Sequence, residues 1–344
     1  MTIAAVILAA GAATRFGAPK VAVRIGSRSL VQIVADTATA AGLSPVIVVA
    51  SSTIDVPETV EVVRNDEPER GMSRSLRLGI AAVPPDAEAA IVLLADQPTV
   101  DVSHLRALDG WRGATPVVAT RADGVLGPPV LIEREGFELV QQAGGDAGLR
   151  GLLRSDPTLV TPVDHAPIPD IDAPEDLEAI TERCWGCAAR YLPQVADETH
   201  PYIGASPACW ATFGEVLARE FENPDYGRVH RHTVDVYAVQ HPGHDDRRQR
   251  QSVALHLIAI CQWLEHDVTD IARLNEITQQ LANEDRDWPW LTPPETYPMT
   301  VGDLLVARSG EEHAQLVRRW AETTWEAWSP HHPTVREWAA ELLR

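Results

Sequence analysis

The sequence predicts an α/β fold with a doubly wound (Rossmann-like), mostly parallel sheet over residues 1–183, followed by a mostly α-helical domain over residues 184–344. Three observations support this prediction. The chain of 344 residues is longer than a typical single domain. Its first half alternates short apolar runs with helical segments, which is typical of a sheet covered by helices on both faces. From position 184 onward strand-like runs become scarce, and this part contains nine of the ten tryptophans and all four cysteines.

Runs of aliphatic and β-branched residues predict the strands of the first half. These runs are residues 2–10, 45–50, 60–64, 90–96, 115–120 and 128–132. Helices are expected between them, at residues 29–41 and 73–82. In the second half, amphipathic segments predict helices at residues 209–221, 251–266, 271–283, 311–328 and 335–343. The prolines of residues 288–298 forbid a helix, so we expect an ordered loop there.

The first predicted strand runs into a glycine-bearing turn. The run VILAAGAATRFGAPK, residues 6–20, has Arg15 between Gly11 and Gly17, and it ends at Lys20, the only lysine of the chain. Free backbone N–H groups at such a turn can face a phosphate, and small residues allow a close approach. The spacing fits neither a P-loop nor a G-x-G-x-x-G dinucleotide turn. The turn is therefore a candidate phosphate-binding loop of another type.

This run resembles the signature L-A-A/G-G-x-x-x-R-M-G-x-x-K of nucleotidyltransferases related to the molybdenum cofactor cytidylyl- and guanylyltransferases, with Phe16 in place of the usual methionine. The resemblance implies that the loop wraps a nucleoside triphosphate and that Lys20, with Arg15 beside it, contacts the phosphates. The other loop residues that would bind the nucleotide are Leu8, Ala9, Ala10, Gly11 and Gly17.

Two further segments match the same family. NDEPERGMSRSLRLG resembles its N-x5-G-x3-S segment, which implies that Asn65, Gly71 and Ser75 lie near the base and ribose. The alternative is a loop and a helix start, with Ser73 as the N-cap. IVLLADQP places Asp96 directly after an apolar strand, where the family holds Mg²⁺ with the acid of its G/A-D-x-P motif. A turn-forming aspartate is the alternative.

The remaining matches concern the acceptor side and a second metal ligand. GPPVLI and GGDAGLRGLL resemble segments that shape the pocket for the second substrate in relatives. The matching positions are Gly127, Pro128, Gly145, Asp146 and Arg150. DIDAPEDL resembles the segment D-I-D-T-P-E-D-L, which makes Asp172 a candidate second Mg²⁺ ligand and Asp170 its alternative. Asp172 is also suited to cap a helix that begins at the following proline.

The ordered set of motifs implies nucleotidyl transfer, in which a phosphate of the acceptor attacks the α-phosphorus of a nucleoside triphosphate and pyrophosphate leaves. The sequence LAAG, where users of GTP carry LAGG, makes CTP the favoured nucleotide and molybdopterin cofactor the implied acceptor. Two alternatives stay open within this chemistry, namely GTP with molybdopterin and a sugar phosphate as the acceptor. An alternative of another class is a nucleotide-binding protein without turnover that recognises a partner such as a molybdoenzyme.

The second half offers weaker signals. CWGC places Cys184 and Cys187 at the spacing of half a zinc site or of a redox pair. Cys209, His200 and His256 are candidates for the missing ligands, although they follow no standard spacing. Asp235 and His241 lie in a second histidine-rich cluster, for which metal binding is one interpretation and a core role the favoured one. Several segments resemble an uncharacterised bacterial family that begins with a similar C-x2-C pair, and that resemblance supplies no activity.

Charge and hydropathy exclude some classes of partner. The formal net charge of -20 disfavours nucleic acid and anionic membranes. No apolar run approaches the length of a membrane span, and the N-terminus lacks the basic start and cleavage site of a signal peptide. We therefore expect a cytoplasmic protein with reduced thiols.

Overall fold

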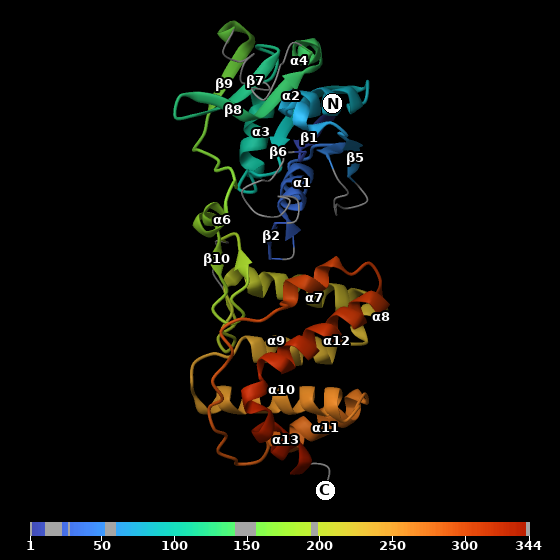
Figure 1. Ribbon diagram of the computed structural model, residues 1–344, viewed down its shortest axis with the longest axis vertical. Coiled ribbons are helices and arrows are strands. Elements are labelled where there is room, and N and C mark those ends of the chain that lie inside the picture. Colours follow the sequence, from blue (N-terminus) through green and yellow to red (C-terminus); the bar gives the residue numbers. More distant parts are fainter. Residues whose placement is uncertain are drawn as a thin grey trace. The chain divides into compact units, whose positions relative to one another are not determined.

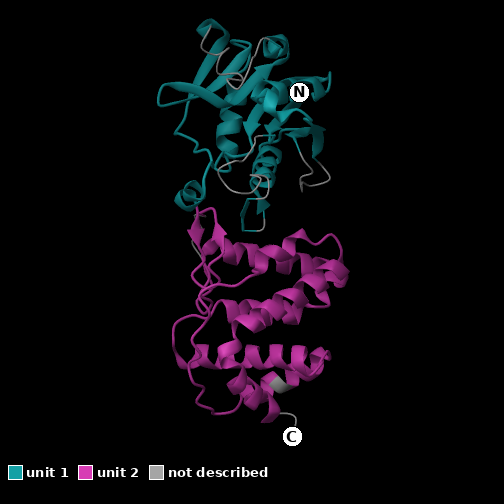
Figure 2. Cartoon of the chain, viewed as in Figure 1, with its two compact units in different colours: residues 1–180 teal, residues 181–344 magenta. Residues whose placement is uncertain are grey.

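The computed structural model describes residues 2–10, 23–26, 28–51, 60–141, 156–193 and 199–341, with the side chain of Ile277 excepted. The chain divides into two compact units, Met1–Ile180 and Thr181–Arg344 (Figure 2). Each unit has hydrophobic core clusters of its own.

A seven-stranded sheet forms the centre of the first unit (Figure 1). Its strands are β1 (Thr2–Leu8), β4 (Val46–Ala50), β5 (Glu61–Arg64), β6 (Ala87–Leu94), β7 (Val117–Ala122), β8 (Val125–Glu133) and β9 (Val160–Asp164). Their order in the sheet is β5-β4-β1-β6-β8-β7-β9. The first four are parallel, β8 is antiparallel to β6 and β7, and β9 is parallel to β7. The expected doubly wound, mostly parallel sheet is confirmed.

Helices cover both faces of this sheet because successive side chains of each strand point to opposite faces. Ile7 of β1 packs in one core cluster with α1 (Leu30–Ala40) and α3 (Val102–Gly110). Val6 packs in the other cluster with α2 (Met72–Ala82). Both side chains are fully buried, and burial of one such side chain contributes about 1.5–3 kcal/mol. The central strands β1, β4 and β6 therefore lack a polar face.

The order in which the chain adds strands to the sheet reverses beside β1. The chain adds β4 and β5 on one side of β1 and then places β6 on the other side. Leu8 pairs with Leu94, so β1 and β6 end level with each other. In open α/β sheets, ligands bind beyond the carboxyl ends of strands at such a reversal. This end of β1 and β6 is called the switch edge below.

Helices make up most of the second unit. They are α7 (Pro207–Glu222), α8 (Pro224–Gly227), α9 (His230–Gln240), α10 (Arg247–Glu265), α11 (Ile271–Ala282), α12 (Gly310–Ala327) and α13 (His332–Glu341). A two-stranded sheet of β10 (Glu182–Arg183) and β11 (Arg190–Tyr191) precedes them. Trp288, Trp320 and Trp328 are among the largest buried side chains of the core. The expected helical second half is confirmed, and residues 286–299 carry no helix, as their prolines predict.

Some elements were not expected from the sequence. β9 and α3 belong to segments that carry no strong apolar run. The helix α9 was not predicted, because its segment shows no polar face at helical spacing. Polar residues of α9 are buried together with its apolar ones, namely His232, Thr233, Asp235 and Gln240. Among the described residues, no helix combines the length and the apolar character needed to cross a membrane.

Candidate active site and metal centre

The switch edge begins where β1 ends. Leu8, Ala9 and Ala10 are buried there. The amide of Ala9 donates to the carbonyl of Val49 at 2.8 Å, and the carbonyl of Leu8 accepts from the amide of Ala95 at 3.1 Å. The predicted nucleotide loop therefore leaves the sheet between β4 and β6. The predicted site residues Gly11, Arg15, Gly17, Lys20, Gly145, Asp146 and Arg150 lie outside the described residues.

Asp96 lies at the switch edge, two residues beyond β6, and its side chain is half-buried. Its carbonyl accepts from the amide of Ile171 at 2.8 Å. Next to it, Gln97 Nε2 donates to Asp170 Oδ1 at 2.9 Å. These two bonds bring the segment that contains Asp170 and Asp172 alongside Asp96. The segment around Ile171 thus lies beside Asp96, although more than seventy residues separate them in sequence.

The helix α6 (Pro174–Ile180) begins two residues after Asp172. The amides of Asp172 and Ala173 donate to Asp176 Oδ2, at 2.9 and 2.8 Å. Asp176 thus satisfies the N–H groups at this helix start, and the side chain of Asp172 is exposed. A carboxylate in this position is a suitable oxygen donor for a hard cation.

Asn65 and Ser75 contact each other at the start of α2. Asn65 Nδ2 donates to Ser75 Oγ at 2.9 Å, and Asn65 Oδ1 accepts from Arg74 Nε and from the amide of Glu67, each at 3.1 Å. Asn65 is fully buried. These bonds fasten the segment between β5 and α2. Gly71, with φ +86°, is the N-cap of α2, so the prediction of Ser73 as N-cap is wrong.

Gly127 and Pro128 of β8 also lie at the switch edge. Val130 pairs with Val92 in the antiparallel ladder, so Pro128 is level with Leu94. Behind it, Thr120 Oγ1 donates to the carbonyl of Pro129 at 2.7 Å.

Thr120 Oγ1 also lies 2.8 Å from His104 Nε2, a buried contact at the start of α3. Burial and the neighbouring His165 lower the pKa of His104 to about 4, so its imidazole is neutral at physiological pH. Sequence reasoning missed His104, because no motif surrounds it.

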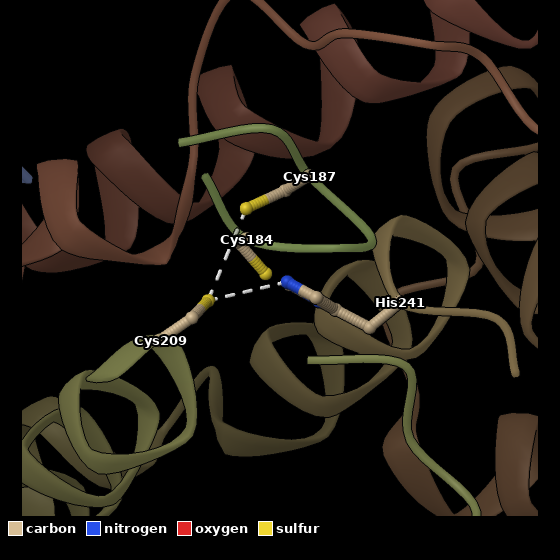
Figure 3. Close-up of side chains that lie close together, drawn as sticks. All are labelled: Cys184, Cys187, Cys209 and His241. Carbon is tan, nitrogen blue, oxygen red and sulfur yellow. Dashed lines mark hydrogen bonds between the residues drawn. The ribbon is translucent and has the colours of Figure 1, made fainter. Parts of the chain in front are cut away.

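The second unit brings together three thiols and one imidazole (Figure 3). The group consists of Cys184, Cys187, Cys209 and His241, and is called the Cys3His group below. Its ligand atoms all lie within 4.8 Å of one another. Cys209 Sγ is 3.9 Å from Cys187 Sγ and 3.2 Å from His241 Nε2. Among the described residues, no other cluster of three or more potential metal ligands is this compact.

Three segments supply the Cys3His group. Cys184 and Cys187 belong to the turn between β10 and β11, which is closed by a 2.8 Å bond from the amide of Cys184 to the carbonyl of Ala189. Cys209 lies in the first turn of α7, whose N-cap Ser206 accepts from the amide of Cys209 at 3.4 Å. His241 is the residue that ends α9.

Glycine permits the close packing of the turn. A Cβ on Gly186 would lie 2.6 Å from the carbonyl oxygen of Gln240, 2.7 Å from that of Gly204 and 2.7 Å from His241 Cδ2. Real Cβ atoms do not approach other atoms this closely, because the repulsion is too strong. The glycine of CWGC therefore allows the turn to lie against the end of α9.

The protonation of His241 follows from its partners. Its Nδ1 lies 2.8 Å from the carbonyl of Tyr237, which can only accept, so Nδ1 carries a proton and Nε2 faces the thiols. Burial alone would lower the pKa of His241, but hydrogen bonds to Cys184 and Cys209 outweigh it and raise that pKa to about 9. Hydrogen bonds from Cys187 and Cys209 lower the pKa of the Cys184 thiol.

Two of the metal ligands considered from the sequence, His200 and His256, do not belong to the Cys3His group. His256 Nδ1 is bound to the buried carboxylate of Asp235 at 2.7 Å. The ring of His200 packs against Trp210. Neither belongs to the Cys3His group, where His241 supplies the imidazole. His241 stands 32 positions from Cys209, and only the fold of α7 and α9 brings the two together.

Comparisons with known protein families match the two halves of the chain separately. Residues 5–163 match the family model described as MobA-like NTP transferase domain, and residues 182–329 match a family of unknown function (DUF5946). The two resemblances expected from the sequence are confirmed, and the first half carries a nucleotidyltransferase domain of MobA-like type.

The individual relatives cover about half of this chain and nearly all of their own length. The purine catabolism protein PucB of Bacillus subtilis (strain 168) is 28% identical over 193 residues, covering 51% of this chain and 94% of the relative. Among solved structures, Rv0371c from Mycobacterium tuberculosis H37Rv is 26% identical, with 52% of this chain and 96% of that chain covered and a TM-score of 0.47. A nucleotidyl transferase from Methanothermobacter thermautotroptrophicus (Mth528) is 22% identical, with 52% and 95% covered and a TM-score of 0.43.

Proposed function

We propose that this chain, which carries a MobA-like NTP transferase domain in its first half, transfers CMP from CTP to the phosphate of molybdopterin cofactor and releases pyrophosphate. One observation supports this proposal most directly. The entrance of the predicted phosphate loop at Leu8, the strand-end acid Asp96 and the segment of Asp172 all lie at the switch edge. A triphosphate and its metal need such groups in one place.

In the proposed reaction the protein positions the reactants and neutralises charge. Lys20 and Arg15 bind the phosphates of CTP, and Lys20 reaches an oxygen as a compact ammonium group where a forked guanidinium does not fit. The acceptor phosphate is already ionised at neutral pH, since its second pKa is about 6, so no side-chain nucleophile is needed. Gly127, Pro128, Asp146 and Arg150 form the acceptor side.

Asp96 and Asp172 are proposed to hold Mg²⁺. The donor set fits this ion, which binds through one or two carboxylates and takes its other ligands from water and phosphates. When bound, the ion offsets negative charge on the phosphates during displacement. Cys184 and Cys187 belong to the other compact unit, and the proposed reaction assigns no step to zinc.

The proposal is tested by pyrophosphate release. The full chain is incubated with Mg²⁺, molybdopterin cofactor and each nucleoside triphosphate in turn. We expect release with CTP, and GTP-dependent release or a requirement for a sugar phosphate would support one of the alternatives instead. Nucleotide binding without release in any mixture would show a binding protein.

Variants then test the metal site. Asp96→Asn should lower the rate of pyrophosphate release at least about a hundredfold, because it removes the negative charge of a proposed Mg²⁺ ligand. Asp109→Asn is the control, since Asp109 is exposed on α3 and pairs only loosely with Arg112 at 3.6 Å. Equal rates in the Asp96 variant and the wild type would remove Asp96 from the site.

A further inference from the structure

We propose that the Cys3His group binds one Zn²⁺ as a closed, four-coordinate structural centre of the second unit. The donor set is the first argument. Three thiolates and one imidazole are ligands that favour zinc, and structural zinc sites are tetrahedral. With Zn–S bonds of about 2.3 Å, two sulfurs at tetrahedral positions are separated by about 3.8 Å. Cys187 Sγ and Cys209 Sγ are 3.9 Å apart.

The second argument is closure. Cys184 is 3% exposed, Cys187 1%, and both Cys209 and His241 are 0% exposed. Four protein ligands fill a tetrahedral shell, and this burial leaves no path for a water or substrate to a further position. Catalytic zinc sites instead keep one position open. A zinc ion here therefore has a structural role.

The surroundings orient the ligands as a metal site requires. His241 donates from Nδ1 to the carbonyl of Tyr237, which directs Nε2 at the sulfurs (Figure 3). The amide of Ser206 donates to Cys184 Sγ at 3.4 Å. Cys209 lies in the first turn of α7, where the helix dipole favours a negative sulfur.

A redox pair fits the same residues less well. Cys184 and Cys187, the pair at redox spacing, are both free thiols. A disulfide would use only two of the three thiols and would give the imidazole of His241 no ligand role. Zn²⁺ instead binds all four groups, and its charge offsets that of the thiolates.

Zinc would join three segments of the second unit. Cys187 and Cys209 are 22 positions apart, and Cys209 and His241 are 32 apart. The ion would thus hold the turn between β10 and β11 against the start of α7 and the end of α9. Binding free energy at such a centre contributes directly to folding.

Metal content of the full chain tests the proposal. After reconstitution with Zn²⁺ and removal of loosely bound ions, we expect about one zinc per chain by mass spectrometry. Cys209→Ser should lower this content at least about tenfold. Cys261→Ser is the matched control, because Cys261 is the one cysteine outside the group, buried beside Glu265 at 3.9 Å. A wild type without zinc, or equal loss in the control, would overturn the proposal.

Cobalt tests the geometry in the wild type, which avoids variants that fail to fold. The metal-free chain is titrated with Co²⁺, and we expect the intense visible bands of tetrahedral cobalt with sulfur ligands, saturating at about one ion per chain and vanishing when Zn²⁺ is added. A weak octahedral spectrum, or none, would contradict the centre. Neither measurement depends on nucleotidyl transfer, so the two proposals stand or fall separately.

Discussion

At the scale of single residues, a motif specifies residue types and spacing but not which atoms are free to bind a ligand. Family resemblance assigns Asn65 and Ser75 to the nucleotide. In the folded chain, Asn65 donates to Ser75 and accepts from Arg74, all through side-chain atoms. We infer that this pair acts by holding the start of α2 against the segment that follows β5.

Ser75→Ala tests this inference. The change leaves Asn65 Nδ2 buried without its partner, which should lower the free energy of unfolding of the first unit by about 1–3 kcal/mol. Hydrogen exchange of the amides in β1 and β6 measures this loss. Ser103→Ala is the control, since Ser103 is exposed on α3 and should change stability by less than about 0.5 kcal/mol. Equal effects of the two changes would contradict the inference.

The Cys3His group shows how much of a site the sequence can predict. Cys184 and Cys187 are recognisable because a single turn fixes their spacing. Cys209 was considered as a ligand, but His241 was not grouped with the cysteines. No local sequence pattern links His241 to Cys209, because the distance between these two residues depends on how α7 packs against α9. Lys20 and Arg15 remain predictions, since they lie outside the described residues.

Gly186→Ala is expected to disturb the Cys3His group without touching a ligand. The new Cβ would press on the carbonyl oxygens of Gln240 and Gly204 and on the ring of His241. Overpacking of this kind costs about 1–3 kcal/mol, and it should also weaken Co²⁺ binding. Gly214→Ala is a matched control on the exposed face of α7, where a Cβ meets nothing within 4 Å and should stabilise the helix by up to about 1 kcal/mol. Unchanged cobalt affinity in the Gly186 variant would refute the expectation.

At the scale of elements, a helix or strand can be predicted from the sequence when its buried side chains are apolar. β1, β4 and β6 are buried on both faces, and continuous apolar runs mark them in the sequence. α12 is amphipathic and was expected within a few residues of its bounds. α9 instead buries polar side chains against other helices, so its pattern reflects tertiary contacts that one segment cannot reveal.

One of these buried polar groups makes the second unit sensitive to acid. The ring of His232 on α9 stacks on Trp263 of α10, with centroids 3.7 Å apart. Burial lowers the pKa of His232 to about 4, against the opposing effect of Asp235 and with support from Arg231 and Arg318. The unfolded chain, with a histidine pKa of about 6.5, therefore binds the proton more readily. Stability from the neutral ring is present above about pH 6.5 and is lost as the pH falls toward 4.

His232→Phe should remove this part of the pH dependence. Unfolding by denaturant is followed by tryptophan fluorescence, which reports mainly on the second unit because nine of the ten tryptophans lie there. Between about pH 7.5 and about pH 5, the wild type should lose more stability than the variant, by up to about 2 kcal/mol. His266→Phe, at the exposed end of α10, should behave like the wild type. Parallel pH profiles of the wild type and His232→Phe would exclude this role.

At the scale of the whole molecule, each of the two units has its own composition and its own hydrophobic core. The core clusters of the first unit contain residues between Ile3 and Val163, and that of the second contains residues between Cys184 and Ala339. The change in composition near position 184 marks the same division, because a parallel sheet and a tryptophan-rich helical core need different residues. A unit with a core of its own can in principle fold alone.

We therefore expect residues 1–180 and residues 181–344 to fold as separate chains. The first fragment should release pyrophosphate from CTP at a rate within about threefold of the full chain, because the nucleotide and metal ligands that we propose all belong to this fragment. The second should bind about one zinc and lose its cooperative unfolding when a chelator removes the ion, since three segments are then no longer joined. Circular dichroism and calorimetry of each fragment provide the measurements. A first fragment that folds but needs the second for turnover would show that catalysis depends on both units, whereas a second fragment that stays folded without metal would show that zinc contributes little to its stability.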